Sequence, residues 1–139
     1  MGWSVRRVAN QSIDPNVDTA ISWDTEDQDT PGNFSPPASV LTIPAGGDGL
    51  WAVTFNAIAA AVMNSMGYCR IKVNIGGPNG FSITNTDFDD VTNPVTGSWC
   101  LALPNLPLVA TNTITGFIQH RGGAATNFTG RLFAYRVGA

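Results

Sequence analysis

Four carboxylates lie within six residues of one another in the first quarter of the chain: Asp24, Glu26, Asp27 and Asp29. They could act as calcium ligands, because Ca²⁺ binds several carboxylate and carbonyl oxygens at once. The spacing departs from an EF-hand loop, which needs a glycine at its sixth position and a glutamate at its twelfth, where Ser35 stands. The alternative, which we favour, is a solvated connection whose aspartate side chains cap turns.

Acid–base catalysis would need a second carboxyl group across a cleft, because paired catalytic carboxyls stand about 5–9.5 Å apart. The aspartates at 87, 89 and 90 could supply it, but no recognisable pattern of substrate-binding aromatics accompanies them. The single histidine, His120, is expected to be structural or on the surface. No His–Cys metal-ligand spacing, glycine-rich phosphate loop or G-x-S-x-G nucleophile elbow is present in the sequence. We therefore expect no enzymatic activity and no cofactor.

Charge is scarce in this chain and unevenly distributed. Charged residues make up 12% of the 139 residues, about half of the ~25% usual in soluble domains. All ten acids lie at or before Asp90, and the net charge is −3. The absence of a basic stripe argues against nucleic-acid binding. No apolar run approaches the roughly 18 residues of a membrane span, and the N-terminus lacks the apolar region of a signal peptide, so we expect neither membrane insertion nor export.

The two cysteines, Cys69 and Cys100, could form a disulfide if their strands are neighbours. Because the sequence gives no indication of export to an oxidising compartment, we favour two buried reduced thiols.

The apolar pattern predicts short strands separated by turns. Residues 69–75 alternate cleanly between apolar and polar, and the stretch ends at the turn sequence GGPNG. Residues 50–63 are ambiguous, because their first half alternates whereas AIAAAVM at 57–63 has helix propensity; we favour a strand. About eight to ten strands with turns every 8–12 residues predict an all-β antiparallel sandwich or barrel, and an eight-stranded jelly roll suits this length.

The chain contains no sign of a second domain. We expect a single jelly-roll domain at residues 13–139, preceded by an N-terminal arm or first strand at residues 1–12. That segment holds Trp3, Arg6 and Arg7, which are candidate partner-docking residues because tryptophan and arginine are frequent anchors of protein interfaces.

The order of the motifs resembles the tumour-necrosis-factor and complement-globular-head superfamily over roughly residues 10–137. The matching pieces are Trp23-Asp24 followed by TPGNF at 30–34, GYCRIKVN at 67–74, which is similar to a strand common in phage and bacterial members, and FTG at 128–130 before the last strand. Two departures stand out: Thr111-Asn112 replace a frequent Gly-Asp pair, and Arg131 stands where an apolar residue is common.

This resemblance implies a ten-stranded jelly-roll sandwich and a homotrimer, and some members of the superfamily bind calcium. Stand-alone members of this type resemble tailed-phage virion proteins. The expected function is therefore a capsid decoration (cement) protein, located in the virion, whose partners are itself and the major capsid protein or another virion protein. The alternative is a receptor- or glycan-binding tail-fibre or tail-tip domain that uses three loops: GGPNG at 76–80, NTDFDD at 85–90 and RGGAATN at 121–127.

Overall fold

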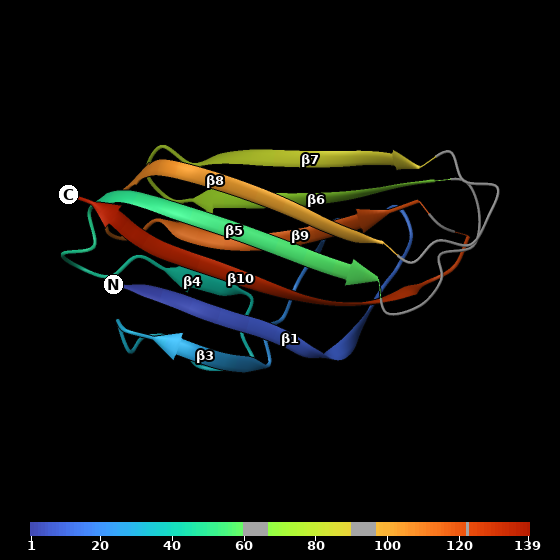
Figure 1. Ribbon diagram of the computed structural model, residues 1–139, viewed down its shortest axis with the longest axis horizontal. Coiled ribbons are helices and arrows are strands. Elements are labelled where there is room, and N and C mark those ends of the chain that lie inside the picture. Colours follow the sequence, from blue (N-terminus) through green and yellow to red (C-terminus); the bar gives the residue numbers. More distant parts are fainter. Residues whose placement is uncertain (60–66, 90–96, 122) are drawn as a thin grey trace.

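The computed structural model describes residues 1–59, 67–89, 97–121 and 123–139, and every long element in these residues is a β-strand (Figure 1). In chain order the strands are β1 (Gly2–Ile13), β2 (Thr19–Ala20), β3 (Thr25–Asp29), β4 (Val40–Thr42), β5 (Gly49–Ala59), β6 (Gly67–Gly76), β7 (Phe81–Asp89), β8 (Ser98–Leu108), β9 (Thr113–His120) and β10 (Thr126–Gly138). The predicted all-β fold is confirmed. No helix in the described part of the chain is long and apolar enough to cross a membrane.

The strands form two antiparallel sheets that pack face to face. Sheet A has the order β3-β1-β10-β5-β8, and sheet B has the order β2-β9-β6-β7. Both β2 and β4 pair with β9, at residues 117–118 and 113–115 respectively, so they lie end to end along the edge of β9 that does not face β6. The first and last strands of the chain are neighbours in the middle of sheet A, as Figure 1 shows.

Strand β6 illustrates how alternation specifies this fold. Cys69, Ile71, Val73 and Ile75 point into the sandwich and are buried. The chain then turns through GGPNG, where Gly77 has φ +88° and Asn79 has φ 55°. A Cβ atom at Gly77 would approach the Thr111 carbonyl oxygen to 3.0 Å, so this turn requires glycine. β7 pairs with β6 along its whole length.

Two segments differ from, or extend beyond, their expected limits. The ambiguous stretch is a strand as far as Ala59, the end of β5, and residues 60–63 lie outside the described residues. The polar stretch 85–90, expected to be a loop, continues β7 to Asp89. Pairing with β6 on one side is sufficient to hold such a polar sequence extended, because an edge strand needs only one partner.

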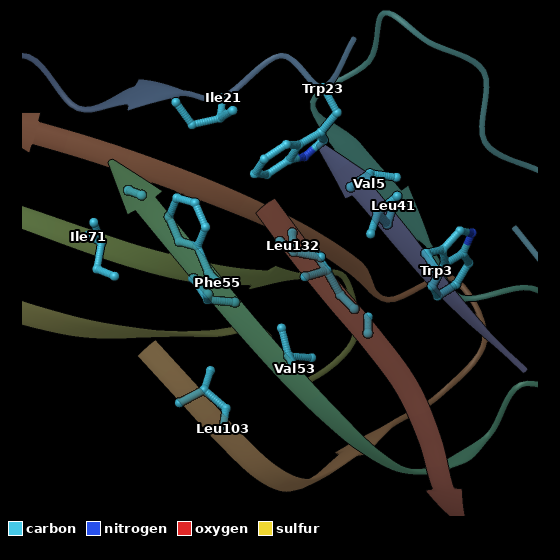
Figure 2. Close-up of a cluster of buried hydrophobic side chains, with 14 of the residues drawn as sticks. Trp3, Val5, Ile21, Trp23, Leu41, Val53, Phe55, Ile71, Leu103 and Leu132 are labelled. Carbon is cyan, nitrogen blue, oxygen red and sulfur yellow. The ribbon is translucent and has the colours of Figure 1, made fainter. Parts of the chain in front are cut away.

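The core between the sheets is rich in tryptophan, and Figure 2 shows side chains from both sheets converging there. Trp3 of β1 stacks on Trp51 of β5 at 5.3 Å between ring centroids. Trp23 meets the edge of Phe55 at 5.8 Å and an interplanar angle of 90°. Burial of such large aromatics dominates the stability of small sandwiches, since replacing one by alanine costs about 3–5 kcal/mol.

His120 and Cys69 lie opposite each other on the inner side of sheet B, whereas Cys100 lies on the outer side of sheet A. His120 is fully buried, and its Nε2 lies 2.7 Å from the Ile13 carbonyl oxygen, to which it donates because a carbonyl can only accept. Cys69 is buried, whereas Cys100 is exposed on the outer side of β8 because Trp99 occupies the inward position. The expectation of two buried thiols is therefore wrong for Cys100.

Strand β8 forms the edge of sheet A opposite β3. Its register against β5 shifts between Trp51 and Val53, and Asn105 in this irregular stretch has φ 57°. Pro104 and Pro107 flank that residue and are exposed. Since proline carries no amide hydrogen, this edge offers an interrupted row of donors.

Candidate interaction face

Asp24 caps a β-bulge in β1, so its carboxylate contacts the protein as well as solvent. The register of β1 against β10 shifts between Arg7 and Gln11, which leaves amides in between without strand partners. The Asp24 carboxylate accepts hydrogen bonds from the amides of Val8 at 2.9 Å and Ala9 at 2.8 Å. Partial burial alone would raise the pKa of Asp24, but these amides and the Arg7 guanidinium at 3.6 Å outweigh it and lower the pKa.

Asp27 joins two arginines from different strands. It is the extra residue of a bulge in β3, because its neighbours Glu26 and Gln28 pair with consecutive residues of β1. Its Oδ1 accepts from Arg6 Nε at 2.9 Å and Nη2 at 2.6 Å, and its Oδ2 accepts from Arg131 Nη2 at 2.9 Å. Hydrogen bonds from Arg6, which has the larger effect, and from Arg131 lower the pKa of Asp27.

The other two acids have separate surroundings. Asp29 accepts hydrogen bonds from the amides of Gly32 and Phe34, both at 2.8 Å, which is a turn cap of the expected kind. Glu26 is exposed. Among the described residues, no three His, Cys, Asp or Glu side chains gather as a metal site would require. The acidic stretch is also not merely a connection, because Thr25–Asp29 form the edge strand β3.

The residues expected to dock on a partner are split between the core and the surface. The N-terminal segment is not an arm: it forms β1, which pairs with β3 on one side and β10 on the other. Trp3 is completely buried, and its Nε1 donates to Asn33 Oδ1 at 3.2 Å, so the folded chain cannot offer this side chain to a partner. Arg6 stays at the outer surface of sheet A, whereas the Arg7 side chain is largely buried and its guanidinium donates to the carbonyl oxygens of Ser22 and Asn10.

Both arginines line a surface hollow of about 320 Å³, which we call the arginine hollow. It is lined by Arg6, Arg7, Val8, Asn56, Ile58, Thr129, Gly130 and Arg131. A second hollow of about 380 Å³ shares three of those residues and continues across β5 to β8. The sequence did give one signal for this site, because Arg131 stands where the superfamily commonly has an apolar residue. Asn56 and Ile58 carried no such signal.

Next to the arginine hollow, the outer surface of sheet A carries neutral side chains. We call this surface the sheet A face; it comprises Leu50, Ala52, Thr54, Ala102, Phe133, Tyr135 and Val137. The register aligns Phe133, Thr54 and Ala102 across three strands. Leu50 and Val137 are exposed by 37% and 55%. None of these residues is charged, so the face loses little hydration free energy when it is covered.

The outer surface of sheet B is more polar. Asp18, in the loop before β2, binds Arg70 at 3.0 Å and Lys72 at 2.7 Å. Partial burial opposes ionisation of Asp18, but hydrogen bonds from Lys72 and Arg70 prevail and lower its pKa. Neighbouring positions along β6 and β7 include Asn74, whose Oδ1 accepts a hydrogen bond from the Ser82 hydroxyl.

The loops proposed for a tail-tip site do not come together. GGPNG lies at the end of the sandwich near both chain termini, whereas β9 delivers residue 121 to the opposite end (Figure 1). The segment 85–89 is strand, residue 90 lies outside the described residues, and so does residue 122 of the third loop. A single binding surface built from all three segments is therefore excluded.

A scan against models of known protein families finds no match, and a search of curated proteins finds none either. Among solved structures, the chain is similar to the globular domain of zebrafish complement 1qA protein, with a TM-score of 0.68 and 13% sequence identity. The match covers 98% of this chain and 96% of that one. The chain thus has the jelly-roll fold of a complement 1q globular domain.

Proposed function

We propose that this chain is a structural protein that associates with itself as a homotrimer and serves as a capsid decoration protein of a tailed-phage virion. The observation that carries the proposal is the sheet A face, where exposed Leu50 and Val137 lie beside half-buried Phe133 and Tyr135 with no charged residue among them. Contiguous apolar surface of this kind marks contact sites on proteins.

The neutral side chains of sheet A favour this face over the opposite one. Each outer surface carries a charge cluster whose desolvation costs several kcal/mol per ion, Asp18 with Arg70 and Lys72 on sheet B and Asp27 with Arg6 and Arg131 on sheet A. Covering the sheet A face also buries alanine, threonine and aromatic surface, which contributes roughly 25 cal/mol per Å². Self-association therefore uses sheet A, and sheet B stays in contact with solvent.

The virion assignment rests on the resemblance to phage jelly rolls and on the low charge content, which suits a chain built into a large particle. The acidic stretch gives no support to a catalytic role. Asp24, Asp27 and Asp29 accept hydrogen bonds from amides or guanidinium groups of the protein itself, so their oxygens are committed to holding the fold.

Sedimentation equilibrium tests the self-association, with Thr54→Glu as the disrupting variant and Thr84→Glu as its control. Thr54 lies between Phe133 and Ala102 in the sheet A face, whereas Thr84 is exposed on β7 of sheet B. We expect a wild-type trimer, retention of the trimer by Thr84→Glu, and at least about 100-fold weaker association for Thr54→Glu, because an unpaired buried charge costs roughly 3 kcal/mol or more. A wild-type monomer would contradict the proposal.

Addition of the purified protein to phage shells that lack decoration protein tests the location. Stoichiometric binding at threefold or quasi-threefold positions is the expected result. Binding to host cells or glycans, with no binding to shells, would instead support the tail-tip function.

A further inference from the structure

We propose that the arginine hollow receives a carboxylate side chain from a second copy of this chain, in a ring-shaped assembly. This inference rests on the proposed self-association and adds which groups meet and how the copies are arranged.

The hollow holds more positive than negative charge. Two exposed guanidinium groups, those of Arg6 and Arg131, share one carboxylate, Asp27, whereas the Arg7 guanidinium pairs with Asp24. Both Asp27 oxygens already accept hydrogen bonds. Within the described residues, Arg131 donates one hydrogen bond, to Asp27, of the five that a guanidinium can donate. One further carboxylate would neutralise the cluster and use the remaining donors.

A partner that covers the arginine hollow must supply that carboxylate, because apolar side chains lie beside the guanidinium groups. Val8 and Ile58, which also line the hollow, are exposed by 57% and 50%. A partner that covers these apolar side chains also removes water from the guanidinium groups. Desolvated charge without a counter-ion is strongly unfavourable, so the partner surface must bring an anion with it.

The hollow is continuous with the sheet A face. Arg131 and Phe133 are two residues apart on β10, and Asn56 and Thr54 are two apart on β5, so each pair points to the same side of the sheet. Arg131 also lies over the Phe133 ring at 4.8 Å. Any copy that covers Phe133 therefore reaches the hollow.

The chain itself is a suitable source of the carboxylate. Its net charge is −3, and Glu26 and Asp14 are exposed side chains that make no hydrogen bond or ion pair with another described residue. A twofold dimer through this face would place identical surfaces against each other and bring arginine hollows together. Electrostatic repulsion disfavours that arrangement, whereas a ring places the hollow against a different surface of the next copy.

The decisive variant is Asn56→Asp, which places a carboxylate in the hollow from within and leaves the Arg6–Asp27–Arg131 contacts in place. Its control is Asn74→Asp, the same change beside Lys72 on sheet B. Sedimentation equilibrium at about 0.05 M and about 0.5 M NaCl measures association. We expect about tenfold weaker association of Asn56→Asp at low salt, together with a smaller loss on raising the salt, and wild-type behaviour of Asn74→Asp.

A second pair of variants removes a cation instead of adding an anion. Arg131→Gln is expected to weaken association about tenfold, and its control Arg70→Gln, which also loses a contact to an aspartate, is expected to leave association unchanged. Thermal unfolding confirms that each variant is folded.

The outcomes separate the two proposals. A wild-type monomer at about 100 μM, a concentration at which even a weak specific assembly forms, would remove the self-association and this inference with it. A wild-type ring whose strength neither Asn56→Asp nor Arg131→Gln alters would leave the self-association standing and overturn the carboxylate contact. A wild-type twofold dimer would overturn the ring.

Discussion

The two outer surfaces of the sandwich carry nearly the same charge cluster. On sheet A, Asp27 lies between Arg6 at 2.6 Å and Arg131 at 2.9 Å, and Arg131 stands over Phe133 at 4.8 Å. On sheet B, Asp18 lies between Lys72 at 2.7 Å and Arg70 at 3.0 Å, and Lys72 stands over Phe117 at 4.7 Å. Each cluster therefore has one aspartate, two cations and one aromatic ring.

The two clusters differ in what surrounds them. The sheet A cluster borders a hollow with a third arginine and exposed Val8 and Ile58. The sheet B cluster is flanked by polar residues such as Gln119 and Thr84, which pair with Arg70 and Lys72. Under the proposal, the same local chemistry serves as a contact site in one place and as a solvated surface in the other, and the neighbouring residues decide between these roles.

The largest difference in unfolding free energy between the two sheets is expected between Asp24, which caps β1 of sheet A, and Asp18 of the sheet B cluster. Asp24→Ala removes two hydrogen bonds to backbone amides and should lower the free energy of unfolding by about 1–2 kcal/mol. Asp18→Ala removes exposed ion pairs and should cost less than about 1 kcal/mol. Urea unfolding measures both values. Equal losses would show that the bulge in β1 does not depend on its cap.

Low pH is expected to reduce the stability difference between wild type and Asp24→Ala. The folded pKa of Asp24 is lowered, as are those of Asp18 and Asp27, so the unfolded chain takes up protons at higher pH than the folded one. The stabilisation is complete above the unfolded pKa of about 3.8 and is lost as the pH falls through the folded values. Urea unfolding near pH 7 and near pH 3 should show a smaller gap between wild type and Asp24→Ala at the lower pH. A gap that does not shrink would mean that Asp24 acts through packing.

The smallest effects are expected at the two aromatic rings. Phe133→Leu and Phe117→Leu each remove a cation–π contact and should lower the stability of the dissociated chain by about 0.5 kcal/mol. Urea unfolding at a concentration where the chain is dissociated should give equal values within error. Sedimentation should then separate them, since only Phe133 lies in the sheet A face. A difference of more than about 1 kcal/mol between the dissociated variants would show that the clusters are not equivalent.

The fold could be predicted from the sequence because its information is local. Alternation in β6, the glycine turn after it and the spacing of turn residues each follow from neighbours in the chain. Segment 25–29 was missed as a strand because Glu, Asp and Gln have low strand propensity. Its pairing with β1 overrides that propensity, and a charged strand is tolerated because it lies at the edge of the sheet.

The interaction face could be predicted only in part, because its contacts are far apart in sequence. Arg6 and Arg7 were identified from their residue type, but Arg131 reaches Asp27 across 104 positions. Trp3 was assigned to the surface because residue type does not reveal which side of a strand faces the core. The register that buries it depends on bulges, at Asp27 in β3 and after Arg7 in β1, that have no signature in a single sequence.

Both edges of sheet A resist the addition of a further strand. β3 carries Glu26 and Asp27 at one edge, and β8 carries Pro104 and Pro107 at the other. Negative charge repels an incoming strand, and proline removes donors that it would need. Growth of this sheet from copy to copy, the route to fibrils, is therefore blocked at either side. A chain that associates through the sheet A face, as proposed, can therefore meet its neighbours without aggregating through its edges.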